Sequence, residues 1–156
     1  MTTVQIGKAA PDFKALSTFG EITLKQCNGR GVVLYFYPKD NTPGCTTETE
    51  NFRDLHDQFL AQSCVVIGVS RDSLKSHENF SKKLELPFPL ISDSDEVVCN
   101  TYDVIKMKQM YGKQVRGIER STFLVNPQGI IVREWRGVKV DGHAAEVYAS
   151  IQSSHS

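Results

Sequence analysis

Two apolar runs, at 32–37 and 64–70, dominate the first half of the chain. Both are rich in β-branched and aromatic residues and are too short to cross a membrane, which is typical of strands covered on both faces. Between them, apolar residues recur at helical spacing from Cys45 to Phe59. A strand, a helix and a strand in this order predict a right-handed crossover with two parallel strands.

Smaller elements are predicted around this unit. Two antiparallel strand pairs are expected, and the later one, around the turn 126–129, carries the strongest hairpin signal in the chain. The expected strands outside the crossover are 13–16 with 21–24, an extended piece at 87–91, and 120–125 with 130–135. The expected helices are 74–84, 96–102 and a last one from Asp141 or Gly142, before a polar tail from Gln152. Residues 103–118 are expected to form an irregular surface loop.

Cys45 is predicted to lie in the first turn of its helix and to face inward, because Pro43 and Gly44 disfavour helix before it. The free N–H groups and the positive dipole end of a helix N-terminus stabilise an anion, so a thiol placed there ionises more readily than an ordinary cysteine. The thiolate is the nucleophilic form. Thr42 and Thr46 are expected to place hydroxyls beside the sulfur. The alternative is a buried, unreactive cysteine, since free cysteine is among the most buried residue types.

Composition limits the classes of function. The 156 residues, 40% hydrophobic and 23% charged, suit a single domain over 1–156. Eighteen basic residues balance eighteen acidic ones, and no basic stripe of the kind that binds nucleic acid is present. No signal peptide or spanning segment is recognisable, so we expect a soluble, cytoplasmic protein with no nucleic-acid or membrane partner. The four cysteines are not closely paired, which argues against a disulfide framework and a zinc site, and we expect no metal or other cofactor.

The segment 38–48, PKDNTPGCTTE, resembles the active-site signature of the peroxiredoxins, and its TPGCT portion is most similar to the peroxiredoxin Q or bacterioferritin comigratory protein branch. The resemblance extends from 7–13 to 138–143. It implies a thiol-dependent peroxidase that reduces hydrogen peroxide and organic hydroperoxides through a sulfenic acid on the cysteine. The implied fold is α/β and thioredoxin-like, with a central mixed sheet flanked by helices and an N-terminal hairpin, which agrees with the predicted order of elements.

The resemblance also implies roles for individual residues. Arg120 stands before a predicted strand, as the arginine of the family does, and would stabilise the thiolate and the leaving oxygen. Arg53 and Arg116 are weaker candidates. Glu48 is expected to fix a nearby arginine or a backbone N–H rather than to act as a base. The implied catalytic residues are Cys45, Thr42 and Arg120, and the implied substrate-binding residues are Pro38, Pro43, Gly44 and Thr46.

The chain departs from the family pattern at the resolving cysteine, which forms a disulfide with the oxidised thiol. The position five residues after Cys45 is Glu50, and Ser81 stands where other members carry this cysteine in the following helix. A serine cannot form the disulfide, so we expect an external thiol from glutathione, glutaredoxin or thioredoxin. Cys64 and Cys99 are expected in the core and Cys27 in an accessible loop, none of them as an internal partner.

Several alternatives remain open from the sequence. The chain could be a peroxide-sensing redox switch without efficient turnover, or a non-catalytic thioredoxin-fold interaction module with an inert Cys45. A monomer or weak dimer is expected. No histidine is assigned chemistry: His56 and His77 are expected to be exposed or satisfied locally, and His143 to lie near the start of the last helix.

Overall fold

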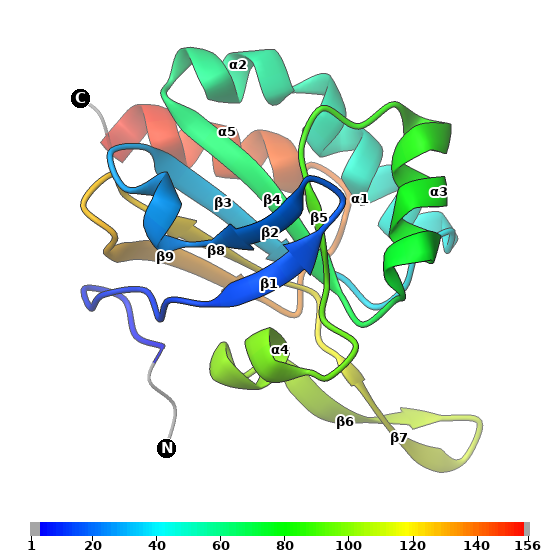
Figure 1. The fold of residues 1–156 in the computed structure, drawn as a ribbon. Helices are drawn as coiled ribbons and strands as arrows, with labels where there is room; N and C mark the ends of the chain where they lie inside the picture. Colours follow the sequence, from blue (N-terminus) through cyan, green and yellow to red (C-terminus); the bar gives the residue numbers. More distant parts are fainter. Residues whose placement is uncertain (1–3, 155–156) are drawn as a thin grey trace.

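The computed structural model describes residues 4–154. Strands and short helices alternate along the chain, as Figure 1 shows. The strands are β1 (Lys14–Ser17), β2 (Gly20–Thr23), β3 (Gly31–Phe36), β4 (Cys64–Ser70), β5 (Leu90–Ser92), β6 (Ile105–Met110), β7 (Lys113–Ile118), β8 (Ser121–Val125) and β9 (Ile131–Arg136). The helices are the 3-10 turn η1 (Lys25–Cys27) and α1 (Pro43–Asp54), α2 (His56–Ala61), α3 (Leu74–Leu84), α4 (Val97–Thr101) and α5 (His143–Ser154).

A seven-stranded mixed sheet with the order β2-β1-β5-β4-β3-β8-β9 organises the molecule. β3 pairs in parallel with β4 and antiparallel with β8, so it lies in the interior of the sheet, and all six of its residues are buried. The β3–α1–α2–β4 segment forms the predicted crossover with parallel strands. The N-terminal hairpin β1–β2 and the late hairpin β8–β9 are also present as predicted.

Alternating residues of β3 build the two halves of the core. Val33 and Tyr35 face one side of the sheet, where they join apolar residues of α1, α2, α3 and α5. Val32, Leu34 and Phe36 face the other side and join residues of α4 and the N-terminal segment. Figure 1 shows α1, α2 and α5 on the first side and α4 on the second. This two-sided cover explains why β3 is apolar at successive positions rather than at alternate ones.

The predicted helix after β3 begins earlier than expected and is interrupted. α1 starts at Pro43, because a proline at the first helical position loses no intrahelical hydrogen bond. Thr42, with an extended backbone, precedes it as the N-cap residue. The helical pattern then breaks at Leu55, which separates α1 from α2.

The expectation of an irregular loop over 103–118 is wrong. β6 and β7 form an antiparallel hairpin that projects from the body of the molecule in Figure 1. Tyr111 and Gly112 both have positive φ, 52° and 75°, as the two-residue turns favoured in hairpins require. The hairpin was missed because most of its residues are exposed, so it carries little of the apolar alternation by which strands are recognised.

The remaining helices lie close to their predicted positions. α3 has the predicted bounds, and α4 lies within the predicted 96–102. α5 continues to Ser154, so the polar tail expected from Gln152 is helical up to that residue, and residues 155–156 lie outside the described part of the chain. Among the described residues, no helix has the length and apolar character needed to cross a membrane.

Candidate functional site

Cys45 is the third residue of α1, directly after the loop that follows β3. Its side chain is completely buried and packs in the core half that contains Tyr35 and Phe52. The first turn of a helix has N–H groups without intrahelical partners and the positive end of the helix dipole. The sulfur therefore lies inward and beside a local positive potential, as the sequence predicts.

Arg120 reaches this sulfur from the start of β8. Its Nη2 donates to Cys45 Sγ at 3.4 Å, and its Nη1 donates to Glu48 Oε1 at 2.6 Å. The two ends of the guanidinium fork thus hold a sulfur and a carboxyl group that are one helical turn apart on α1. The side chain of Arg120 is only 16% exposed, which keeps its charge close to the sulfur and poorly screened by water.

Gly44 leaves room for the guanidinium. A Cβ at this position would lie 3.3 Å from Arg120 Nη2, which is closer than an ordinary contact. A larger residue would therefore press on the same nitrogen that donates to the Cys45 sulfur. A small residue is therefore needed before the cysteine because of the space that Arg120 occupies, and not because of a positive φ.

Glu48 is almost completely buried beneath Arg120. Burial raises the pKa of Glu48 to about 7, although the charge and hydrogen bond of Arg120 act in the opposite direction. Its second oxygen, Oε2, is buried without a hydrogen-bond partner. Glu48 therefore fixes the arginine, as expected, and its own charge depends on a balance between burial and one salt bridge.

The other expected site residues surround the start of α1 without bonding to the sulfur. Thr42 Oγ1 donates to the carbonyl oxygen of Lys39 at 2.8 Å, and the N–H of Thr46 donates to the carbonyl oxygen of Thr42 at 2.9 Å. Pro43 is exposed, and Pro38 is half-buried directly after the buried Tyr37. Among the described residues, the side-chain hydrogen bond to the sulfur comes from Arg120 rather than from a threonine.

The two weaker arginine candidates have other partners. Arg53 Nη1 donates to the carbonyl oxygen of Leu84 at 3.0 Å. Arg116 pairs with Glu96, which also binds Arg71 at 2.9 Å. The structure therefore brings Arg120, and not these two, to Cys45.

The other three cysteines are less acidic than ordinary thiols. Burial raises the pKa of Cys64 to about 12, and burial raises the pKa of Cys99 further. Cys27 is half-buried, and burial raises its pKa as well. Cys64 and Cys99 lie in the core as predicted, and all four cysteines are free thiols.

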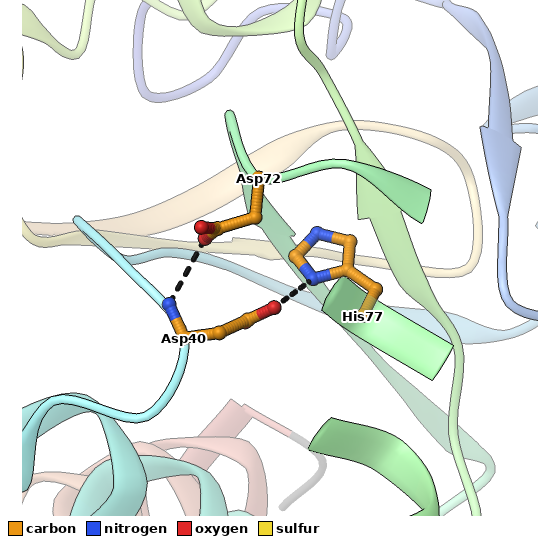
Figure 2. A group of neighbouring side chains, drawn as sticks. All are labelled: Asp40, Asp72 and His77. Carbon is orange, nitrogen blue, oxygen red and sulfur yellow. Dashed lines mark hydrogen bonds and ion pairs between the residues drawn. The ribbon is translucent and has the colours of Figure 1, made fainter. Parts of the chain in front are cut away.

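A cluster of buried polar residues next to the loop 38–42, which we call the Cys45 loop because it leads into the first turn of α1, was not predicted. Asp40 lies in this loop, and its Oδ2 bonds to His77 Nδ1 of α3 at 2.7 Å, as Figure 2 shows. The backbone N–H of Asp40 donates to Asp72 Oδ2 at 2.9 Å. The expectation that His77 is exposed or satisfied locally is wrong, because it is fully buried and its partners come from distant segments. Its place on the buried stripe of α3 with Phe80 and Leu84 is the signal that could have shown this.

The same three side chains are the candidate metal ligands of the described residues. One ligand atom each of Asp40, Asp72 and His77 lies within 4.8 Å of the others. Asp40 Oδ2 and His77 Nδ1 bond to each other, and Asp72 Oδ2 accepts from Ser70 and from the Asp40 backbone. These atoms already satisfy one another, and we assign no metal to them.

His143 is buried at the start of α5 as predicted for its position. Its Nε2 lies 2.8 Å from Thr122 Oγ1, two residues after Arg120. Burial lowers the pKa of His143 to about 4, so the ring is neutral at neutral pH. It supports the β8 strand next to the site and does not contact the sulfur.

Comparison with known proteins gives consistent matches. The model of the AhpC/TSA family matches residues 6–134. "Peroxiredoxin Bcp" of Xanthomonas campestris is 53% identical over 139 residues, which cover 89% of this chain and 87% of that protein. A solved structure of a Xylella fastidiosa PrxQ mutant superposes with a TM-score of 0.94 at 44% identity, covering all of both chains. A structure of the Xanthomonas campestris bacterioferritin comigratory protein, described in terms of its alkyl peroxide reduction activity, gives a TM-score of 0.88 at 50% identity and covers 92% of each chain.

Two further structures bear on the missing resolving cysteine. Both are of Xanthomonas campestris Peroxiredoxin Q, and each carries a different single cysteine-to-serine mutation. The two mutated positions are 36 residues apart, which is also the separation between Cys45 and Ser81. In that protein a cysteine therefore occurs at the spacing where this chain has a serine.

Proposed function

Because the chain belongs to the AhpC/TSA family, and within it to the peroxiredoxin Q or bacterioferritin comigratory protein branch, we propose that it reduces hydroperoxides with Cys45 as the nucleophile. The peroxiredoxin family and the thioredoxin-like α/β fold expected from the sequence are confirmed. The observation that carries the assignment of Cys45 is the hydrogen bond from Arg120 Nη2 to a sulfur in the first turn of α1.

The proposed reaction begins with attack of the Cys45 thiolate on the terminal oxygen of the hydroperoxide. The S–O bond forms while the O–O bond breaks; the terminal oxygen keeps its proton as the sulfenic acid, and the leaving oxygen takes the electron pair and a proton from water to become an alcohol or water. Negative charge moves from the sulfur to the leaving oxygen during this step. The guanidinium of Arg120 can stabilise both atoms because its charge is already held beside the sulfur by Glu48.

We propose that Thr42 accepts a hydrogen bond from the hydroperoxide. Its hydroxyl proton is committed to the carbonyl oxygen of Lys39, which leaves the lone pairs of Oγ1 as acceptors. An acceptor at this position would hold the O–H of the substrate while Arg120 holds its negative charge. Pro38, Pro43, Gly44 and Thr46 frame the same end of α1, where we propose that they contact the substrate.

The substrate class is proposed to be hydrogen peroxide and organic hydroperoxides. The Xanthomonas campestris relative is described in connection with alkyl peroxide reduction. Attack by the Cys45 thiolate requires only a terminal O–O–H group, so a small alkyl substituent on the other oxygen does not change the reaction.

We propose that an external thiol resolves the sulfenic acid on Cys45. A thiolate attacks the Cys45 sulfur, a disulfide forms and water leaves, and a second thiol then releases the reduced enzyme. Ser81 cannot serve as the internal partner, and burial makes Cys64 and Cys99 poor nucleophiles by raising their pKa. Glutathione, glutaredoxin and thioredoxin are the candidate reductants. The monomer or weak dimer and the cytoplasmic location remain predictions.

Mass spectrometry after one equivalent of hydrogen peroxide tests the resolution step. In the presence of glutathione we expect a glutathione adduct on Cys45; without a thiol we expect sulfenic acid, and sulfinic acid after a second equivalent of peroxide. An intramolecular disulfide that contains Cys45 would refute external resolution.

Peroxide consumption with a recycling reductant tests turnover separately. A peroxidase consumes many equivalents, whereas a redox switch without efficient turnover consumes one per chain. Single-equivalent consumption with each of glutathione, glutaredoxin and thioredoxin would contradict the proposed enzyme.

A further inference from the structure

Because Cys45 is buried, an external thiol can reach its sulfur only if the surrounding structure opens. Cys45 has no exposed surface, and it lies in the first turn of α1, which directly follows the loop 38–42. A peptide or protein thiol is much larger than the terminal O–O–H of a hydroperoxide, and it must approach the sulfur in line with the S–O bond. The loop and the first turn of α1 therefore have to move after oxidation. The hydrogen bonds that fix this loop to the rest of the fold oppose that movement.

One set of bonds ties this loop to the rest of the fold. Asp40 is 4% exposed, and its carboxyl group makes three side-chain hydrogen bonds, with Tyr37, Ser76 and His77. Its Oδ1 accepts from Tyr37 Oη at 2.6 Å, and its Oδ2 accepts from Ser76 Oγ at 2.8 Å and bonds His77 Nδ1 at 2.7 Å. We call these four residues the Asp40 clasp.

The clasp joins the Cys45 loop to α3 and, through His77, to the central sheet. His77 Nε2 lies 2.8 Å from the carbonyl oxygen of Ile91 in β5. Because a backbone carbonyl only accepts, Nε2 carries a proton. The other ring nitrogen, Nδ1, bonds to Asp40 Oδ2 (Figure 2), so the imidazole of His77 bridges the loop that carries Asp40 and strand β5.

The position of Asp40 gives the clasp control over the start of α1. The next residue, Asn41, has φ of 63° and turns the chain, and Thr42 then precedes the helix. The backbone N–H of Asp40 also donates to Asp72, which lies two residues after the end of β4. With both the side chain and the backbone of Asp40 fixed, the residues up to Cys45 have little freedom.

We propose that the Asp40–His77 pair is a positioning pair, which sets the balance between a closed form that reacts with peroxide and an open form in which an external thiol reaches Cys45. The inference rests on the proposed function. The pair acts through the loop and contacts neither the sulfur nor the substrate. A weaker clasp is predicted to slow the reaction with peroxide, to speed resolution by thiol, and to lower the fraction of Cys45 that proceeds to sulfinic acid.

Two substitutions of His77 distinguish an effect of the Asp40 clasp from a general loss of stability. In His77→Gln the amide nitrogen can take the place of Nε2 and keep the bond to Ile91, while the bond to Asp40 is lost. In His77→Asn the amide nitrogen can take the place of Nδ1 and keep the bond to Asp40, while the bond to Ile91 is lost. Both variants lose the imidazole ring, so the difference between them reports the hydrogen bond to Asp40 against the one to Ile91. Ser76→Ala removes one donor at a half-buried position and serves if the His77 variants do not fold.

The first readout does not depend on catalysis. The reduced protein is treated with a bulky maleimide, and the alkylation rate of Cys45 is followed by peptide mass spectrometry. His77→Gln is expected to raise this rate at least tenfold over the parent and over His77→Asn, and Ser76→Ala is expected to raise it several-fold. Tyr102→Phe, which removes a hydrogen bond to the Pro11 carbonyl in the other half of the core, is expected to leave it unchanged.

The second readout is the ratio of glutathione adduct to sulfinic acid at fixed peroxide and glutathione, which should rise in His77→Gln and not in Tyr102→Phe. Equal alkylation of Cys45 in the parent, the folded His77 variants and Ser76→Ala would overturn the proposal, as would a rise in sulfinic acid. If neither the parent nor any variant consumes peroxide, the proposed function fails. The alkylation rates still decide whether the clasp controls access to Cys45.

Discussion

Replacing Arg120 by methionine should lower peroxide reactivity and stability through two separable causes. The variant keeps much of the length of the side chain but removes the donor to Cys45 Sγ and the partner of Glu48. Removal of one preorganised donor from a site of developing negative charge costs about 100- to 1000-fold in rate. Removal of one member of a buried ion pair costs about 3–5 kcal/mol of stability, because the other member remains buried without compensation. At pH 8, above the pKa of about 7 for Glu48, the pair is charged in the parent; loss of Arg120 removes the group that lowers this pKa, so protonation of Glu48 relieves part of the cost.

The double variant Arg120→Met with Glu48→Gln distinguishes the two causes. An amide has no charge to compensate, so we expect urea unfolding to recover most of the lost stability. Peroxide reactivity should remain as low as in Arg120→Met, because the guanidinium beside the sulfur is still missing. Glu48→Gln alone is the control: its amide oxygen can still accept from Arg120, so reactivity should be largely kept.

Rapid mixing with hydrogen peroxide at pH 8, with dithiothreitol as the reductant, gives the rate constant for the oxidation step. Recovery of the parent rate by the double variant would refute the reasoning, because Arg120 would then serve only to neutralise Glu48. An unchanged rate in Arg120→Met would refute it as well.

Two further predictions follow from the geometry of the same site. Glu48 has a pKa of about 7 in the folded protein against an ordinary value of 4.5, so between these pH values the unfolded chain loses a proton that the folded chain keeps. The unfolding free energy of the parent should therefore fall by about 3 kcal/mol from pH 4.5 to pH 7 relative to Glu48→Gln, as measured by urea unfolding, and a parallel pH dependence of the two proteins would contradict this. Gly44→Ala should slow peroxide reduction about tenfold, because the new methyl group would lie 3.3 Å from Arg120 Nη2 and displace it. Its stability should be kept or raised, since alanine favours helix over glycine, and unchanged peroxide kinetics would show that the guanidinium moves aside without consequence.

The sequence was most informative where one local pattern had one interpretation. The apolar run of β3, the proline-rich turn and the spacing that buries Cys45 could all be read directly. Arg120 is 75 residues from Cys45 in the chain, and only the resemblance to a family identified it, because no local pattern connects a strand with a helix start so far away.

The features that were missed depend on tertiary structure or on exposure. The β6–β7 hairpin contains little apolar alternation because most of its residues face water, and the Tyr111-Gly112 turn was its main signal. Asp40 and His77 are separated by 37 residues and are brought together by the packing of a loop against α3. Neither residue in isolation predicts that the two form a buried hydrogen-bonded pair.

The most direct test of Cys45 as the nucleophile compares two variants in single-turnover reaction with hydrogen peroxide. One variant carries Cys45→Ser, and the other keeps Cys45 while Cys27, Cys64 and Cys99 are replaced by alanine. The account predicts that the variant with Cys45 alone keeps most of the rate constant of the parent, and that Cys45→Ser loses it. Rapid peroxide consumption by the Cys45→Ser protein would contradict the account.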